Sequence, residues 1–511
     1  MVLREKIVIL DFGSQYTQLI ARRIRELGTY SEIFPFWTEP ENFGEGVIGI
    51  ILSGGPSSVY DQNRLLPSKK IFEMNIPVLG ICYGLQVISL LFGGRIVGNE
   101  KGEYGYQKIN IIEVSKLLKG VKDGSTVWMS HGDKVKEIPP GFKRTASTEF
   151  SPFAVIENTE RRIYGIQFHP EVAHTEYGLK ILANFVNEIC GSSGEWNLEG
   201  FLTMKIQEIR DTVGDSPVLL ALSGGVDSSV VAYILEKAIG YNYYPIFVDT
   251  GLLKKGEAER IQRIFGNNPN LRIVNASEEF FLTLQGTKDP ERKRKKIGGK
   301  FIEIFEREAK NIGINFQFLA QGTLYPDVIE SNPIVGPSRV IKSHHNVGGL
   351  PQKLHLRLVE PLKELFKDEV RQLGRLLDVP EEILRRHPFP GPGMAVRIVG
   401  EVTPQKVRML QEADQLIEEI IKRHDLYDKI WQIFPVFLPV KTVGIKGEKR
   451  SYENVLAIRA VVSLDGMTAD WYRIPYKVLN EISSTLLNSI EGINRVVYDV
   501  STKPPATIEW E

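Results

Sequence analysis

A strand that turns sharply into a helix decides the fold of the first part of the chain, and it reads Pro77-Val78-Leu79-Gly80-Ile81-Cys82-Tyr83-Gly84-Leu85-Gln86. Gly80 and Gly84 lack Cβ atoms, so the backbone can turn tightly on both sides of Cys82. Short β-branched runs alternate with helix-period segments through most of the 511 residues, a pattern typical of parallel-sheet α/β domains. We therefore predict an α/β fold. Its first strand lies near 6–10, and Ser14 is expected to cap a helix that ends at Gly28.

A second strand-to-helix turn opens the middle of the chain, where a strand near 218–222 leads into Ser223-Gly224-Gly225-Val226-Asp227-Ser228-Ser229. The small, polar segment 191–194 is typical of a linker, and the Pro- and Gly-rich stretch 387–393 breaks the pattern again. Beyond it, long helices and alternating strands predict an α+β domain. We expect two parallel-sheet α/β domains, at residues 1–191 and 200–394, followed by an α+β domain at 395–511.

Composition limits the partners and the compartment. Lys+Arg and Asp+Glu both number 63, so no overall basic field points to nucleic acid or to an anionic membrane. No apolar run of ~18 residues is present, so no membrane span is expected. The start of the chain goes directly into a strand without a signal-peptide pattern. Two cysteines, Cys82 and Cys190, do not make a disulfide framework, which favours a reducing, cytoplasmic location.

Cys82 is a candidate nucleophile. A thiol at a helix N-terminus meets free N–H groups and the helix dipole, both of which favour the thiolate. The alternative is an inert core cysteine, the fate we assign to Cys190.

Two further segments favour a reactive Cys82. His169 and Glu171 are two residues apart in extended chain, so both side chains point to one side, and Glu171 can orient the imidazole as it exchanges the thiol proton. The segment 53–56 (Ser-Gly-Gly-Pro) follows a strand and can offer the Gly55 N–H to an oxyanion, with the Tyr83 N–H as second donor. Of the competing histidines, His131 is expected to line the pocket at most, and His174 to lie on the surface.

Together these three segments resemble the class I glutamine amidotransferase domain over about residues 5–190. The resemblance implies that Cys82 attacks the side-chain amide of glutamine, that His169 protonates the departing ammonia and that Glu171 orients His169. It also implies that Gln86 contacts the glutamine substrate.

The loop 223–229 is a candidate phosphate site. Its small residues expose backbone N–H groups, and the following helix adds its positive end, so the loop can hold an anion such as pyrophosphate. Asp227 can bind Mg²⁺ that bridges the phosphates. No Lys occupies the Walker position, which disfavours kinase-type transfer. The alternative is a Ser/Gly turn that caps an ordinary helix.

The loop is similar to that of the N-type ATP pyrophosphatases, whose fold is of the adenine nucleotide alpha hydrolase type. The resemblance implies ATP contacts at Ser223, Gly224, Gly225, Val226, Asp227, Ser228, Ser229, Asp249, Gly322 and Lys363. The basic run 289–299 can be a solvated helix face or a nucleic-acid contact, but with few aromatics in a neutral chain it points to a small, phosphate-bearing substrate.

Over its full length the chain resembles the glutamine-hydrolysing GMP synthetase family. The segments 341–351, 360–363, 387–393 and 501–511 carry this match beyond the two loops. The resemblance implies Mg²⁺-dependent adenylation of xanthosine monophosphate (XMP) by ATP and amination to GMP in a homodimer formed by the C-terminal domain. It places the XMP contacts at Arg294, Gln432, Arg459, Lys503 and Glu509.

Three other functions explain the sequence less well. An RNA-modifying ATP pyrophosphatase acting on tRNA shares the phosphate loop but does not explain Cys82, His169 and Glu171. A dimeric nucleotide sensor without catalysis does not explain them either. NAD synthetase pairs this loop with a glutaminase of a different, nitrilase-like type.

Overall fold

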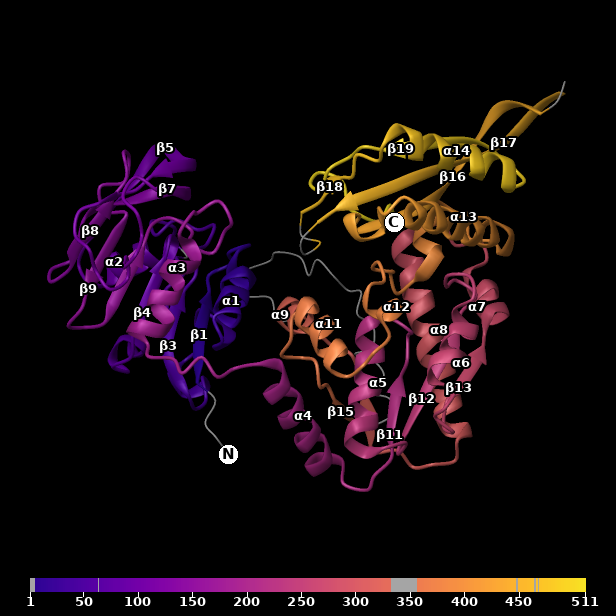
Figure 1. Ribbon diagram of the computed structural model, residues 1–511, viewed down its shortest axis with the longest axis horizontal. Helices are drawn as coiled ribbons and strands as arrows, with labels where there is room; N and C mark the ends of the chain where they lie inside the picture. The colour runs from indigo at the N-terminus through magenta and orange to yellow at the C-terminus, as the bar shows by residue number, and fades with distance from the viewer. Residues whose placement is uncertain (1–4, 63, 332–355, 447–448, 464–465, 467) are drawn as a thin grey trace. The chain divides into compact units, whose positions relative to one another are not determined.

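The computed structural model describes residues 5–62, 64–331, 356–446, 449–463, 466 and 468–511 (Figure 1). The segment 341–351, which contributed to the family resemblance, lies outside these residues. The chain forms two compact units and passes from the first to the second between Phe201 and Leu202, with a short stretch from Val328 assigned to the first.

An eight-stranded sheet forms the centre of the first unit, in the order β2-β1-β3-β4-β10-β9-β8-β6. The strands β1 to β4 and β10 are parallel, whereas β9, β8 and β6 add an antiparallel edge. The bounds are β1 Lys6–Asp11, β2 Tyr30–Pro35, β3 Val47–Leu52, β4 Val78–Ile81, β6 Asn110–Ile111, β8 Lys143–Ser147, β9 Val155–Asn158 and β10 Ile163–Ile166. The predicted parallel α/β sheet is confirmed, and the strands of its antiparallel edge lie between residues 110 and 158.

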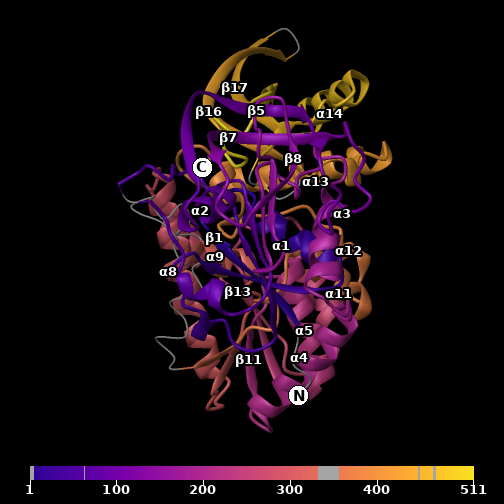
Figure 2. The same ribbon diagram turned by 90° about the vertical axis from the view of Figure 1, so that its left-hand side faces the viewer.

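The remaining elements of the first unit surround this sheet. The helices are α1 Thr17–Glu26, α2 Tyr83–Leu91 and α3 Gly178–Ala183, the last continuing as one π-helical segment, Asn184–Ile189. The strands β5 Arg95–Lys108 and β7 Thr126–Glu137 form a separate antiparallel ribbon (Figure 2). The predicted cap of α1 is wrong: Tyr16 occupies the N-cap, and the Ser14 hydroxyl accepts from the Tyr16 N–H (3.1 Å) in a turn before the helix.

A parallel five-stranded sheet, β13-β12-β11-β14-β15, begins the second unit. Its strands are β11 Val218–Ala221, β12 Tyr243–Asp249, β13 Arg272–Asn275, β14 Phe318–Ala320 and β15 Arg357–Val359. From the central strand β11 the chain goes first to β12 on one side and later to β14 on the other. Crevices at the carboxyl ends of such strands are where α/β sheets bind ligands, so the loop after β11 lies at the expected position.

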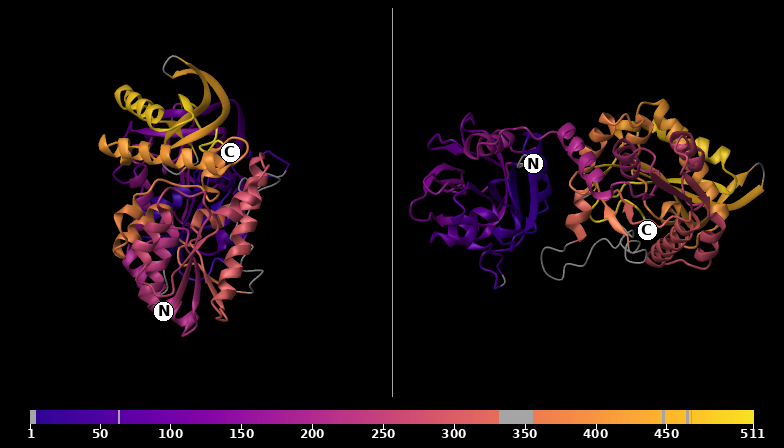
Figure 3. Two further views of the ribbon diagram at one scale, coloured as in Figure 1. Left: turned by 90° about the vertical axis from the view of Figure 1, so that its right-hand side faces the viewer. Right: turned by 90° about the horizontal axis from the view of Figure 1, so that it is seen from below.

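Helices accompany this sheet and connect it to a second layer. They are α4 Leu198–Val213, α5 Val226–Ile239, α6 Glu257–Phe265, α7 Ser277–Leu284, α8 Pro290–Asn311, α9 Tyr325–Ser331, α11 Lys367–Leu376 and α12 Glu381–Leu384. The second layer contains α13 Pro404–Arg423, β16 Gln432–Lys446, β17 Lys449–Val462, β18 Asp470–Trp471, α14 Tyr476–Ser489 and β19 Ile493–Asp499. Its sheet is mixed: β16, β17 and β18 are antiparallel, and β19 pairs with β17 in parallel. Figure 3 shows α13 and α14 packed side by side.

One hydrophobic core joins the two layers of the second unit. It runs from Leu219 and Ile246 through Met394 and Ile398 to Leu486, all of them buried. The predicted α+β character of the C-terminal part is therefore present, and its elements share their core with the α/β layer. None of the helices in the described ranges is long and apolar enough to cross a membrane.

Candidate active sites

Cys82 occupies the turn between β4 and α2. Its backbone has φ 53° and ψ −104°, an uncommon conformation for a residue with a side chain, and its N–H donates to the Ile166 carbonyl (2.7 Å). A Cβ on Gly84 would lie 2.4 Å from the Leu52 carbonyl oxygen, so only glycine fits there. The turn therefore holds the thiol at the start of α2.

His169 and Glu171 follow β10, the neighbour of β4 in the sheet. The His169 Nδ1 lies 2.7 Å from Glu171 Oε1, and both side chains are buried. A Cβ on Gly54 would lie 3.2 Å from His169 Cε1 and 3.7 Å from Cys82 Cβ, so the imidazole and the thiol meet over this glycine. The structure thus brings the three predicted residues together.

The electrostatics of this cluster favour proton transfer. Although burial opposes protonation, the charges of Glu171 and Cys82 and their hydrogen bonds hold the pKa of His169 well above its ordinary value. Since Glu171 engages Nδ1, the other ring nitrogen remains for the thiol proton. The cluster is arranged as a thiol and an imidazole that a carboxylate orients.

A cavity of about 500 Å³ opens beside the thiol. The predicted Gly55, Tyr83 and Gln86 all line it. The Gln86 amide donates to the Asp133 carbonyl (2.8 Å), and the Cys82 thiol lies 3.6 Å from the Ser130 carbonyl. His131 lines the cavity as expected, and His174 is exposed.

Sequence reasoning missed a buried acid behind this cavity. Glu103 is 4% exposed and its Oε2 lies 3.1 Å from His131 Nε2, while Ser151 and Thr148 donate to its carboxylate. The His131 ring is close to this carboxylate but out of line for a hydrogen bond to it. Burial opposes ionisation, but His131, Ser151 and Thr148 lower the pKa of Glu103. No local pattern marks Glu103, because its partners are distant in the sequence.

The second site surrounds the loop after β11. Gly224 has φ +75°, Gly225 is the N-cap of α5, and the hydroxyls of Ser223 and Ser228 lie 2.9 Å apart. The N-terminus of α5 receives no capping hydrogen bond from any side chain in the described residues, so its first N–H groups face the loop. This geometry fits an anion such as a phosphate group.

Polar atoms without a protein partner cluster around this loop. Within the described ranges, the buried Asp227 Oδ1, Ser229 Oγ and Gln321 Nε2 make no hydrogen bond. A Cβ on Gly322 would lie 3.1 Å from Asp227, so Gly322 lets the end of β14 approach the loop closely. Buried polar atoms are rarely left unpaired, so these groups indicate a polar ligand.

The other predicted ATP residues lie at neighbouring strand ends. Asp249 ends β12 and its Oδ1 accepts from the Gly251 N–H (2.9 Å). Lys363 is exposed beyond β15. A cation that sequence reasoning missed, Lys367 at the start of α11, lies 3.4 Å from Asp227 Oδ2.

Four of the five predicted XMP contacts, Gln432, Glu509, Arg294 and Lys503, make polar contacts in the structure. Glu509 accepts from Gln432 Nε2 (2.8 Å) and from the buried Arg397, which was not predicted. Arg294 donates to the Glu511 carbonyl (2.5 Å), and Lys503 Nζ to the Gly466 carbonyl (2.7 Å).

Two basic residues of this region are enclosed. Arg459 is fully buried and donates to the carbonyls of Ser501 and Thr507, so its guanidinium holds the C-terminal segment in place. Lys293 is also fully buried, where it contacts Glu511 and the Ile398 carbonyl. The basic run is therefore not a uniformly solvated helix face.

Comparisons with known proteins identify the family. Residues 8–189 match the family model of the class-I glutamine amidotransferases, and residues 419–510 match the GMP synthase C terminal domain. A glutamine-hydrolysing GMP synthase of Aquifex aeolicus is 54% identical over 510 residues, which cover 99% of this chain and 100% of that relative. The glutamine-hydrolysing GMP synthase of Nitratiruptor sp. is 54% identical over 512 residues, and that of Brachyspira hyodysenteriae is 53% identical over 510 residues. Each match covers 99% of this chain and 99% of the relative. The chain belongs to the glutamine-hydrolysing GMP synthase family.

Proposed function

We propose that this chain aminates XMP to GMP, with ammonia released from glutamine at the Cys82 site and ATP cleaved at the loop 223–229. One observation carries the proposal: a Cys-His-Glu cluster and a phosphate-type loop occur together in a chain 54% identical to a glutamine-hydrolysing GMP synthase. The tRNA alternative has no support from these relatives, and the burial of Lys293 weakens its basic surface further.

At the first site, the Cys82 thiolate attacks the side-chain carbonyl carbon of glutamine. The oxygen takes up negative charge beside the N–H groups of Gly55 and Tyr83. His169 gives its proton to the departing ammonia, which leaves a glutamyl thioester on Cys82. His169 then takes a proton from water, the hydroxide displaces the thiolate, and glutamate leaves.

At the second site, the 2-oxygen of XMP attacks the α-phosphorus of ATP, and pyrophosphate leaves. The N–H groups at the start of α5 and the Ser229 hydroxyl would hold the phosphates. Ammonia then attacks the adenylated carbon, AMP leaves and GMP forms. We assign the phosphates to residues 223–229, with Lys363 in support, and the adenosine side to Asp249 and Gly322.

Magnesium fits this site as a cofactor. The unpartnered Asp227 Oδ1 offers one carboxylate oxygen, and the described residues contain no cluster of three ligating side chains. Magnesium typically takes one or two carboxylates and completes its shell with water and substrate phosphates. Bound there, it would neutralise phosphate charge during cleavage.

We assign XMP to the side of the second unit where Gln432 and Glu509 meet, with Arg294, Lys503 and Arg459 around it. The contacts among Gln432, Glu509 and Arg397 support a preformed polar surface. Since Arg459 is enclosed by backbone carbonyls, its contribution would be to hold the segment that carries Glu509.

We also propose a homodimer through the C-terminal layer and a cytoplasmic location. The dimer is supported by exposed apolar residues on the β16–β17 hairpin, among them Val443 and Ile445. The two free cysteines support a reducing compartment.

The test is GMP formation from XMP, ATP and Mg²⁺ with either glutamine or ammonium as the nitrogen donor. Wild type should use both donors. Cys82→Ala should lose glutamine-dependent activity by about 1000-fold or more and keep ammonium-dependent activity, because only the nucleophile is removed. Cys190→Ala is the matched control and should keep both. If neither donor gives GMP while ATP is split to AMP and pyrophosphate, XMP is the wrong acceptor.

A further inference from the structure

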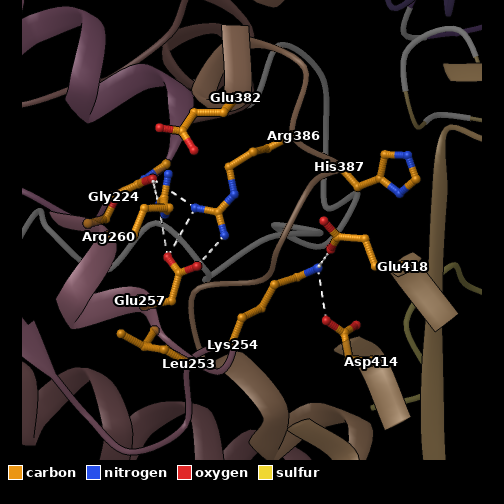
Figure 4. Close-up of polar contacts among 12 residues, drawn as sticks. Gly224, Leu253, Lys254, Glu257, Arg260, Glu382, Arg386, His387, Asp414 and Glu418 are labelled. Atoms are coloured by element: carbon orange, nitrogen blue, oxygen red, sulfur yellow. Dashed lines mark hydrogen bonds and ion pairs between the residues drawn. The ribbon is translucent and has the colours of Figure 1, made fainter. Parts of the chain in front are cut away.

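Two arginines approach the back of the phosphate loop from different elements. Arg260 of α6 donates to the Gly224 carbonyl through Nη2 (2.8 Å), and Arg386, which follows α12, donates to the same oxygen through Nη1 (3.1 Å). Figure 4 shows both guanidinium groups directed at Gly224. A backbone carbonyl that accepts from two charged donors is firmly fixed.

An acid joins the two arginines. Glu257 accepts from Nη2 and Nη1 of Arg386 (2.6 and 3.0 Å) and from Nη2 of Arg260 (2.8 Å). The Glu257 side chain is 11% exposed. The Arg386–Glu257 contact is a two-pronged pair, which fixes the orientation of the guanidinium as well as its position. Glu257 thus keeps two like charges together at one carbonyl oxygen.

The orientation of this carbonyl sets the orientation of a loop N–H. In a trans peptide, the Gly224 C=O and the Gly225 N–H point in opposite directions. With the carbonyl held on the arginine side, the Gly225 N–H faces the inside of the loop, where it donates to Ser223 Oγ (3.3 Å). Gly224 has φ +75°, and glycine adopts many backbone conformations. Without the two arginine contacts, the Gly224–Gly225 peptide could therefore rotate readily.

The segment after Arg386 reaches the other substrate surface of the same unit. The His387 ring stacks on Tyr427 with centroids 4.1 Å apart, and its Nε2 lies 2.9 Å from the Tyr427 carbonyl. The next carbonyl, of Pro388, accepts from Gln432 Nε2 (3.0 Å), the same nitrogen that donates to Glu509. A short, rigid segment therefore connects the phosphate loop with the polar surface assigned to XMP.

We propose that Arg386 is a positioning residue of the synthetase reaction: it fixes the Gly224–Gly225 peptide so that the loop can bind the pyrophosphate part of ATP, and it ties this loop to the Gln432–Glu509 surface. The inference rests on the proposed function of the loop. Arg386 does not itself touch the substrates, so its removal changes affinity for ATP and pyrophosphate through the loop.

The adjacent Arg385 provides a matched control. It has the same charge, but it pairs with the exposed Asp428, and its own side chain is 53% exposed. We compare Arg386→Gln with Arg385→Gln in the full-length chain, with ammonium as nitrogen donor so that the glutamine site is not needed. For Arg386→Gln, the KM for ATP and the inhibition constant of pyrophosphate should each rise about 10-fold or more, the effect of losing a charged hydrogen bond. The KM for XMP should rise by a smaller factor, and Arg385→Gln should stay within about 2-fold of wild type in all three.

Two further measurements keep the inference falsifiable. Arg386→Lys retains the charge and the long side chain but cannot contact both Glu257 oxygens and Gly224 at once, so it should be intermediate even if Arg386→Gln folds poorly. Added methylguanidine should restore part of the ATP affinity of Arg386→Ala. Equal behaviour of the Arg385 and Arg386 variants, or wild-type pyrophosphate inhibition in Arg386→Lys, would overturn the inference. Calorimetric titration of wild type with pyrophosphate separates the inference about Arg386 from the proposed function of the loop. If wild type binds no pyrophosphate, the proposed phosphate site itself is refuted.

Discussion

At the scale of single residues, the glutamine cavity depends on a pair outside the Cys-His-Glu cluster. His131 Nδ1 lies 2.9 Å from the Asp133 carbonyl, and the buried Glu103 faces its other nitrogen. Both ring nitrogens of His131 therefore have an oxygen atom as neighbour. The Asp133 carbonyl also accepts from Gln86, so the pair helps to hold a wall of the cavity.

Glu103→Gln tests this arrangement. The amide keeps the volume, but its single oxygen can accept from only one of Ser151 and Thr148, and it loses the charge that faces His131. The KM for glutamine should rise about 3- to 10-fold, as expected when a charge-assisted contact is lost, while ammonium-dependent GMP formation should not change. Steady-state kinetics with both donors measure this. Glu137→Gln, at the exposed end of the same ribbon, is the control, and an equal effect there would contradict the prediction.

Single residues were predictable where chemistry is encoded locally. Cys82 between two glycines, and His169 two positions before Glu171, have sequence spacings that already define their geometry. Glu103, Arg386 and Lys367 could not be predicted as parts of the sites. Their partners lie 28 to 162 positions away in the chain, and only the folded sheets bring them together.

At the scale of elements, prediction succeeded where local signals agreed. The long helix expected beyond residues 387–393 is α13, where Thr403 caps the first turn through a hydrogen bond from the Lys406 N–H and Pro404 is the first residue. The start of α1 was mispredicted because a serine hydroxyl can accept from the N–H of a local turn as well as from the first N–H groups of a helix. The Ser14 hydroxyl accepts from the Tyr16 N–H in a turn that ends before the helix. The π-helical segment after α3 has no sequence signal that we recognise.

The helix α13 also carries an acid whose ionisation stabilises the second unit. Although burial opposes ionisation of Glu418, Lys254 and Lys422 lower its pKa from 4.5 to about 2. The unfolded chain therefore takes up this proton at higher pH than the native chain. The stabilisation is complete above about pH 4.5 and is lost as the pH falls towards 2.

Glu418→Gln should remove this pH dependence. We expect the free energy of unfolding of the second unit to fall by roughly 1–2 kcal/mol at pH 7, with a much smaller difference from wild type near pH 2, because about half of the native carboxylate is then protonated. Urea unfolding of the full chain at several pH values measures this. Glu419→Gln, the exposed neighbour, should behave like wild type. A difference for Glu418→Gln that is constant from pH 7 to pH 2 would show that ionisation is not the cause.

At the scale of the whole molecule, the β16–β17 hairpin is the surface on which the proposed homodimer can be tested. Val443, Ile445 and Tyr452 are 52%, 77% and 62% exposed, and Val443 pairs directly with Tyr452 across the strands. Exposed apolar side chains gathered on one hairpin are typical of an interface. Figure 1 shows the hairpin projecting from the second layer of its unit.

Ile445→Lys should weaken the dimer. A charge in the centre of an apolar contact would be buried without a partner, so the dissociation constant should rise by about 10-fold or more. Sedimentation velocity over a range of protein concentrations measures the change. Leu282→Lys replaces an equally exposed leucine on α7 and should leave association unchanged. A wild-type chain that sediments as a monomer at all concentrations would contradict the proposed dimer itself.

The two compact units make the use of ammonia a property of the whole molecule. The glutamine cavity lies in the first unit and the phosphate loop in the second, so ammonia released before XMP is adenylated would escape as ammonium. Glutamine hydrolysis is therefore useful only when the second site is occupied. We expect low glutaminase activity without nucleotides and a rise of about 10-fold or more when XMP and ATP are present together, as for sites completed by a conformational step. Glutamate release with no nucleotide, each one alone and both together measures this, and full turnover in the absence of nucleotides would mean that the first unit hydrolyses glutamine regardless of the second.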